Sequence, residues 1–126
     1  MTTAWQNTDL ARIAEAQELT IQTRRADGSL RNPLPIWVVR AGDELYIRSY
    51  KGDAAAWYRT ALASHAGHVS AGGVEADVEF DDVTDGAVND SVDEAYRVKY
   101  ASYGASYTDS MTSPTSRATT LRLSPR

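Results

Sequence analysis

Basic residues are concentrated in the first half of this chain, and their placement suits the binding of an anion. Every charge between residues 75 and 94 is acidic, whereas seven basic residues lie between residues 24 and 59: Arg24, Arg25, Arg31, Arg40, Arg48, Lys51 and Arg59. Lys51 and Gly52 form a turn directly before an expected helix. Free backbone amides at such a turn point outward and bind anions. The sequence predicts either an anion site at this turn or a plain helix entry.

Other chemistries lack their usual residues. The chain has no cysteine, and its two histidines, His65 and His68, are separated by Gly67 and lack the one-face spacing of a helical metal pair. Neither a G-x-S-x-G nucleophile motif nor a histidine-aspartate relay is visible. The net charge of −4 argues against nucleic acid as the main partner. We expect no metal site, no hydrolase activity and no nucleic-acid binding, and we assign no catalytic residue.

Aromatic residues in two stretches have more than one interpretation. Tyr96, Tyr100, Tyr103 and Tyr107 form a stripe that fits a core, a dimer interface or the lining of a pocket. Residues 57 and 58, a tryptophan and a tyrosine, lie on a helix face that must be buried. Core packing is therefore at least as good an explanation for this pair as contact with a ligand.

The elements around the anion turn are predicted to be strand, turn, strand, turn and helix. Residues 34–40 are apolar on both alternating faces, which predicts a central strand buried on both sides. Residues 44–50 return as a second strand with Leu45 and Ile47 on one face. The apolar period then becomes 3.6 over residues 54–65, which predicts a helix with Asp53 as its N-cap.

Two prolines mark the entry to the central strand. Pro33 and Pro35 flank Leu34, and a proline cannot donate a hydrogen bond to a neighbouring strand. We expect this entry to be bulged or unpaired on one side. The backbone groups left free there would be available to a ligand.

Four further strands are predicted at residues 19–24, 67–71, 74–80 and 118–123. The alternation is clearest in residues 74–80, where Val78 faces inward. Ser91 and Glu94 fit a capping box that opens a second helix. Residues 105–116, rich in serine, threonine and tyrosine, are expected to be a loop.

At 126 residues the chain is expected to be a single domain, residues 1–126. It divides into an N-terminal helix (1–17), a barrel core (18–83), a helix (90–104) and a last strand (117–124). No apolar run is long enough to cross a bilayer, and residues 1–9 lack the features of a signal peptide. We expect a cytoplasmic protein that does not associate with membranes.

The order of these motifs resembles that of the split β-barrel superfamily. It runs TRR, a DG turn, RNPLP, GDELY, a KG turn, AAWYRTAL and GHVSAGG. That superfamily includes pyridoxamine-phosphate-oxidase-like flavoproteins and deazaflavin-dependent nitro and quinone reductases. The C-terminal part, from YRVKYASYG to MTSPTSRATTLRL, is similar to a small uncharacterised bacterial family within it.

The resemblance implies a cofactor, either FMN or an 8-hydroxy-5-deazaflavin coenzyme. Its phosphate would lie at strand ends and at the turn before the helix, on Arg24, Arg25, Arg31, Ser49, Lys51 and Gly52. Because adjacent strand residues point to opposite faces, at most one of the first two arginines lies in any one site. Its ring would contact the second strand and the following helix, at Pro35, Ile36, Trp37, Trp57 and Tyr58. The substrate would contact Tyr100, Tyr103 and Tyr107.

We therefore expect a mainly β fold, a six-stranded antiparallel split barrel with a helix between strands three and four and a C-terminal helix. Closure of the sheet removes its open edges. The expected function is a flavin- or deazaflavin-dependent oxidoreductase acting on a small organic substrate, assembled as a homodimer. The alternative is a cofactor-free small-molecule binding protein, because Ser64, His65 and Ala66 stand where the reductases have asparagine and proline.

Overall fold

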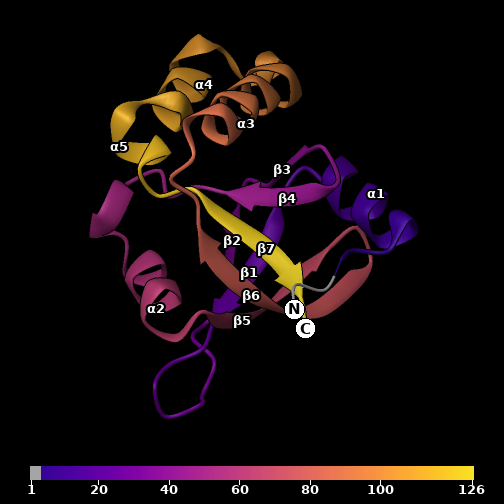
Figure 1. Ribbon diagram of the computed structural model, residues 1–126, viewed down its shortest axis with the longest axis vertical. Coiled ribbons are helices and arrows are strands. Elements are labelled where there is room, and N and C mark those ends of the chain that lie inside the picture. The colour runs from indigo at the N-terminus through magenta and orange to yellow at the C-terminus, as the bar shows by residue number, and fades with distance from the viewer. Residues whose placement is uncertain (1–3) are drawn as a thin grey trace.

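The computed structural model describes residues 4–126, and within them one antiparallel sheet of seven strands forms the centre of the fold (Figure 1). The strands are β1 (Leu19–Thr23), β2 (Leu34–Ile36), β3 (Val39–Ala41), β4 (Glu44–Ile47), β5 (Ala66–Ala71), β6 (Val74–Asp82) and β7 (Leu121–Pro125). Their order across the sheet is β2-β1-β5-β6-β7-β4-β3. The prediction of a mainly antiparallel sheet with helices is confirmed, in the form of a curled half-barrel, but the predicted number of six strands was wrong.

The extra strand arises because the predicted central strand is split. Its two halves, β2 and β3, lie at opposite ends of the sheet although only Trp37 and Val38 separate them in sequence. The sheet must therefore curl until its two ends meet. The prediction of a strand buried on both sides was wrong, since Leu34 is 40% exposed. Pro35, which has no N–H to donate, favours the short strand observed here.

The backbone at this break is bonded to a helix instead of a strand. The Tyr100 hydroxyl accepts a hydrogen bond from the Val38 N–H (3.2 Å) and lies 2.8 Å from the Gln17 carbonyl oxygen and 3.1 Å from that of Val38. The Lys99 ammonium also donates to the Val38 carbonyl (2.6 Å). Buried backbone groups need such partners. The helix that carries Lys99 thus replaces the missing strand neighbour.

The helices are α1 (Asn7–Glu15), α2 (Ala56–Ser64), α3 (Gly86–Lys99), α4 (Ala105–Thr112) and α5 (Pro114–Arg117), with 3-10 turns at Gly52–Ala54 and Ala101–Tyr103. Helices α3, α4 and α5 lie together beyond β3 and β4, whereas α1 and α2 lie at two other sides of the curled sheet (Figure 1). The expected loop at residues 105–116 is therefore helical. Its serines and threonines bond carbonyls of the preceding helical turn, as Ser110 does to Ser106 (2.9 Å).

Two helix starts also differ from the predictions. Helix α2 begins at Ala56 with Ala55 as its N-cap, because Asp53 lies inside the preceding 3-10 turn. Helix α3 begins at Gly86, where the Asp85 side chain accepts hydrogen bonds from two backbone amides. The expected capping box at Ser91 lies inside this helix. The Asp85 cap, six residues upstream of Ser91, explains the difference.

Two apolar clusters lie on the two faces of the β3-β4 edge. The first fills the inside of the curled sheet and includes Leu45, Ile47 and Val78. The second lies between β3, β4 and the α3-α4 pair and contains Val39, Tyr46, Val92, Tyr96, Tyr100 and Met111. The predicted alternation of Leu45 and Ile47 against Tyr46 is thus observed. Most of the predicted tyrosine stripe is core.

A glycine is required where β5 crosses between β1 and β6. A Cβ atom on Gly67 would lie 2.6 Å from the Gln22 carbonyl oxygen and 2.8 Å from the Phe80 ring. At the N-terminal end, the Trp5 indole donates to the Leu123 carbonyl (2.9 Å) and holds the segment before α1 against β7. Residues 1–3 of the predicted N-terminal helix lie outside the described residues. Among residues 4–126, no helix is long and apolar enough to cross a membrane.

Tyr100→Phe tests the hydrogen bonds of the Tyr100 hydroxyl at the break between β2 and β3, which we call the clamp. Loss of the hydroxyl leaves the buried Val38 N–H without a partner, so the free energy of unfolding should fall by about 1–3 kcal/mol. Tyr103→Phe is the matched control, because the buried Tyr103 hydroxyl has no hydrogen-bond partner among residues 4–126 and its loss should cost nothing. Urea unfolding of both variants measures the difference. Equal stabilities would show that the clamp contributes nothing.

Candidate functional site

A cavity of about 690 Å³ opens between the β1-β2 edge, the β4-α2 connection and α4. Small-molecule sites in proteins typically measure roughly 300–1,000 Å³, so this cavity has room for a cofactor-sized ligand. Its walls come from segments far apart in sequence: β1 at Ile21, the helix start at Ala56, and α4 at Met111. We call this space the cavity.

Most of the sequence-predicted cofactor residues lie on the cavity wall: Arg25, Arg31, Pro35, Ile36, Trp37, Ser49, Lys51 and Trp57. Three do not. Arg24 lines a neighbouring hollow, and Tyr58 is 5% exposed and belongs to the first apolar cluster. Gly52 (φ 64°) is buried against α5, where a Cβ atom would lie 2.5 Å from the Thr115 methyl group.

Of the three predicted substrate tyrosines, only Tyr107 lines the cavity. Tyr100 is 1% exposed, and its ring stacks on Trp37 with centroids 3.8 Å apart and planes 2° apart. Tyr103 meets the same indole edge-on at 5.1 Å. These two tyrosines therefore hold Trp37 in place. Because the stripe is largely buried within this chain, it is not the exposed aromatic surface on which the expected homodimer rested, and the dimer stays a prediction.

Two buried hydroxyl groups in the cavity wall have no hydrogen-bond partner within the described residues. They are Thr23 Oγ1 and Ser49 Oγ, on residues that are each 1% exposed. A buried hydroxyl without a partner costs about 1–3 kcal/mol. A ligand with polar atoms in the cavity would supply the missing partners. Thr23 was not predicted from the sequence as a site residue. Its position after Leu19 and Ile21 on the inward face of β1 could have indicated it, because a polar residue there breaks an apolar face.

One part of the cavity wall, which we call the mouth, is positively charged. It consists of the exposed Arg25 and Lys51, the half-buried Arg31 and the first residues of α2. The N-cap residue of α2, Ala55, offers no side-chain hydrogen bond to the first amides of this helix. A helix start carries a partial positive charge and outward-pointing N–H groups, which favour an anion. The negatively charged Asp53 does not line the cavity.

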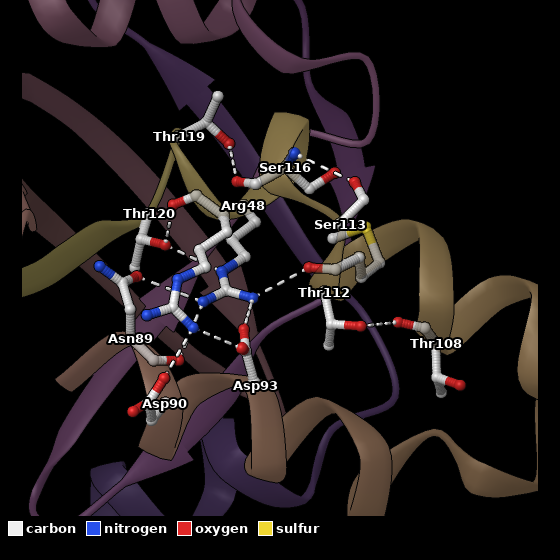
Figure 2. Close-up of polar contacts among 12 residues, drawn as sticks. Arg48, Asn89, Asp90, Asp93, Thr108, Thr112, Ser113, Ser116, Thr119 and Thr120 are labelled. Atoms are coloured by element: carbon white, nitrogen blue, oxygen red, sulfur yellow. Dashed lines mark hydrogen bonds and ion pairs between the residues drawn. The ribbon is translucent and has the colours of Figure 1, made fainter. Parts of the chain in front are cut away.

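The structure also reveals a buried cation that sequence reasoning missed (Figure 2). The Arg48 side chain is 0% exposed and forms an ion pair with Asp93. Its Nε donates to Thr120 Oγ1 (2.8 Å), and its terminal nitrogens donate to the carbonyl oxygens of Met111 (3.0 Å) and Asn89 (3.2 Å). Arg48 thereby joins the end of β4 to α3, α4 and the segment before β7, and it is itself one of the residues that line the cavity.

The partners of Arg48 are held in turn by a second arginine. Arg117 donates to the free carboxylate oxygen of Asp93 (2.6 Å) and to Asp90 (2.8 Å), and these bonds raise the pKa of Arg117. Next to Arg48, the Ser49 N–H donates to Thr119 Oγ1 (2.8 Å). The position of the unpaired Ser49 hydroxyl is therefore fixed from the backbone. Nothing in the sequence pairs residue 48 with residues 89, 93 or 120.

The two histidines lie apart from the cavity. His65 ends α2 in a left-handed conformation (φ 56°), and its ring bonds the Phe80 carbonyl oxygen (2.9 Å). Hydrogen bonds to Asp77 and Glu75 raise the pKa of His68. Among residues 4–126, no group of three or more acidic or histidine side chains is arranged to hold a metal ion.

Residues 9–123 match a family described as an uncharacterized protein conserved in bacteria, DUF2255. The chain belongs to this family. A comparison with curated proteins finds no match.

Solved structures of other proteins share the fold. A Listeria innocua protein assigned as a pyridoxamine 5'-phosphate oxidase is 12% identical, with a TM-score of 0.63 over 95% of this chain and 90% of its own. An F420 reductase is 14% identical, with a TM-score of 0.53 over 92% and 90%. A FAD-binding protein from Mesorhizobium loti is 16% identical, with a TM-score of 0.53 over 99% and 91%. The predicted resemblance to split-barrel proteins is confirmed at the level of the fold.

Arg48→Met tests the buried cation. It removes the donors to Asp93 and to two buried carbonyls, so the free energy of unfolding should fall by about 3 kcal/mol. Arg40→Met is the matched control, because Arg40 pairs with Asp43 at the surface and such pairs contribute at most about 1 kcal/mol. Thermal or urea unfolding compares the two. Equal losses would mean that the Arg48 contacts are not a stabilising network.

Lys99 gives a pH-dependent prediction. Burial lowers its pKa from 10.5 to about 8 in the folded protein. Between these two pH values the unfolded chain binds more protons than the folded one, so stability should rise with pH across this interval. Lys99→Met should remove that rise, whereas Lys51→Met should retain it. The measurement is the urea unfolding midpoint from pH 7.5 to 10.5. If the midpoints of wild type and Lys99→Met change with pH in parallel, the prediction is wrong.

Proposed function

We propose that the cavity binds a flavin-type cofactor, FMN or a deazaflavin coenzyme, and that the protein is an oxidoreductase for a small organic molecule. The observation that carries this proposal is the pair of buried hydroxyls, Thr23 Oγ1 and Ser49 Oγ, without partners in the wall of a largely apolar cavity. A planar ring with a polar edge would satisfy the hydroxyls and fill the apolar space. The shared fold of an F420 reductase and a FAD-binding protein supports the same choice.

The remaining lining residues fit the other parts of such a ligand. Arg25, Arg31 and Lys51 would hold its phosphate at the positively charged mouth, because charge-assisted hydrogen bonds are about twice as strong as neutral ones. Trp37 and Trp57 would contact the ring, and Tyr107 at the rim would contact the substrate. The bound ring would supply the hydride chemistry, while this chain supplies binding, orientation and electrostatics.

Tryptophan emission provides the direct binding test, because Trp37 and Trp57 both line the cavity. FMN should quench this emission and bind about tenfold or more tightly than riboflavin, which lacks the phosphate. If FMN, riboflavin and the deazaflavin coenzyme all leave the signal unchanged at millimolar concentration, the cofactor proposal is wrong. A cofactor-free binding protein would then be the better interpretation.

Thr23→Val tests whether the buried Thr23 hydroxyl bonds the ligand. The substitution keeps the shape of the side chain and removes a hydroxyl without a protein partner, so stability should not fall. Affinity for FMN should weaken by about 1 kcal/mol through the lost hydrogen bond. Ser116→Ala is the matched control, since it removes another buried and unpartnered hydroxyl that does not line the cavity. Equal FMN affinities in both variants would place the ring away from Thr23.

A further inference from the structure

A second hollow of about 460 Å³ lies beside the cavity, and arginines dominate it. Four of them line it, and we call the space the arginine hollow: Arg24, Arg25, Arg31 and Arg59. They come from the end of β1, from the β1-β2 connection and from α2. The connection projects from the body of the protein next to α2 (Figure 1). Two chain segments 30 residues apart thus bring like charges to one place.

These four charges have no direct ion pair in the described part of the chain, although Asp27 and Asp77 lie close enough to Arg25 and Arg24 to interact with them through space. Within residues 4–126, no carboxylate forms an ion pair with any of them, whereas Arg40, Arg48, Arg117, Arg122 and Arg126 all have acidic partners. Backbone carbonyls orient three of the four side chains instead.

Arg24 donates to the Gly28 carbonyl oxygen (2.5 Å), Arg25 to that of Leu30 (3.0 Å) and Arg59 to that of Ala54 (2.8 Å). Each guanidinium has five N–H donors, so every one of them retains donors for a ligand.

The arginine hollow borders the cavity. Arg25, Arg31 and Ala56 line both spaces, so a ligand that extends past these residues would reach from one space into the other. The hydroxyl-bearing Thr60 and Ser64 of α2 also line the hollow. Together with Lys51 of the cavity wall, the four arginines of the hollow bring five positive charges to the two adjoining spaces. One phosphate monoester carries only about −1.5 to −2 charges and would leave most of this positive charge uncompensated.

We infer that the ligand of this site carries an anionic tail beyond its first phosphate, and that the arginine hollow binds this tail. The tail would consist of a second phosphate or of several carboxylates, with Arg24 and Arg59 as the residues that recognise it. Arg25 and Arg31 lie at the junction and contact the first phosphate. This inference rests on the proposed cofactor site and specifies which form of the cofactor it takes.

The experiment compares ligands with the same ring and different tails. FMN and FAD differ by the second phosphate and its nucleoside. The deazaflavin coenzyme with its glutamyl tail is compared with the same molecule truncated after its phosphate. In the wild-type protein, at least one tailed ligand should bind about tenfold tighter than its short counterpart, as expected for added charge-assisted hydrogen bonds. A gain for FAD identifies a diphosphate, and a gain for the glutamyl form identifies carboxylates.

Arg59→Gln and Arg24→Gln assign the effect to the hollow. Each should reduce the affinity of the favoured tailed ligand about tenfold and change that of its short counterpart less than twofold. Arg97→Gln, which removes an exposed arginine of α3 outside the hollow, is the control for overall charge. Circular dichroism of the variants confirms that the fold is retained.

Two results would overturn the inference, and they differ from failure of the cofactor site itself. Equal binding of tailed and short ligands by the wild type, with FMN still bound, removes the tail and leaves the cofactor proposal intact. The inference is also wrong if Arg59→Gln weakens the affinity for the tailed and the short ligand equally. If no flavin or deazaflavin binds the wild type at all, the proposed cofactor and this inference both fall.

Discussion

The buried Arg48 guanidinium constrains the arrangement of the whole C-terminal half. A charge removed from water is tolerated only when its hydrogen bonds are fully satisfied. Arg48 meets this requirement with donors to Asp93, to the carbonyls of Met111 and Asn89, and to Thr120. Its partners lie on α3, on α4 and in the segment before β7. These bonds fix how the elements pack against the end of β4, and Arg48 and Met111 form part of the cavity wall there.

The second constraint is the short path between the two ends of the sheet. Because Trp37 and Val38 alone connect β2 to β3, the sheet has to curl, and the connection passes beside the cavity. Tyr100 occupies the backbone groups of Val38 and stacks on the Trp37 ring. One side chain thus bonds the backbone between the two sheet ends and fixes an aromatic wall of the cavity. Stability and the shape of the candidate site depend here on the same contacts.

Positive charge is concentrated at one end of the candidate site. The chain is acidic overall, yet the cavity mouth and the arginine hollow collect positive charge from β1, from the β1-β2 connection and from α2. The acidic residues of the second half pair elsewhere, as Asp93 does with two arginines and Asp77 with His68. The positive electrostatic field at the mouth is therefore local, and it could not be inferred from the net charge of the chain.

The sequence by itself determined the elements that depend on local patterns. The alternation in β6, the glycine turns and the 3.6 period of α2 gave the antiparallel strands, the helix between them and the placement of most cavity residues near one another. These signals operate over a few residues, where backbone conformation and apolar periodicity decide the outcome. The basic half and the acidic half were visible for the same reason.

Tertiary structure alone decided the rest. The run at residues 34–40 has the pattern of one strand, and the bonds from Tyr100 and Lys99, more than 60 residues away, hold its two halves at different sheet ends. The helices of residues 105–117 have weak local preference and are fixed by contacts such as the one from Arg48 to Met111. The roles of Arg48 and Thr23 likewise depend on which partners fold against them. A partner distant in sequence leaves no periodic signal, so burial and pairing could be read only from the assembled fold.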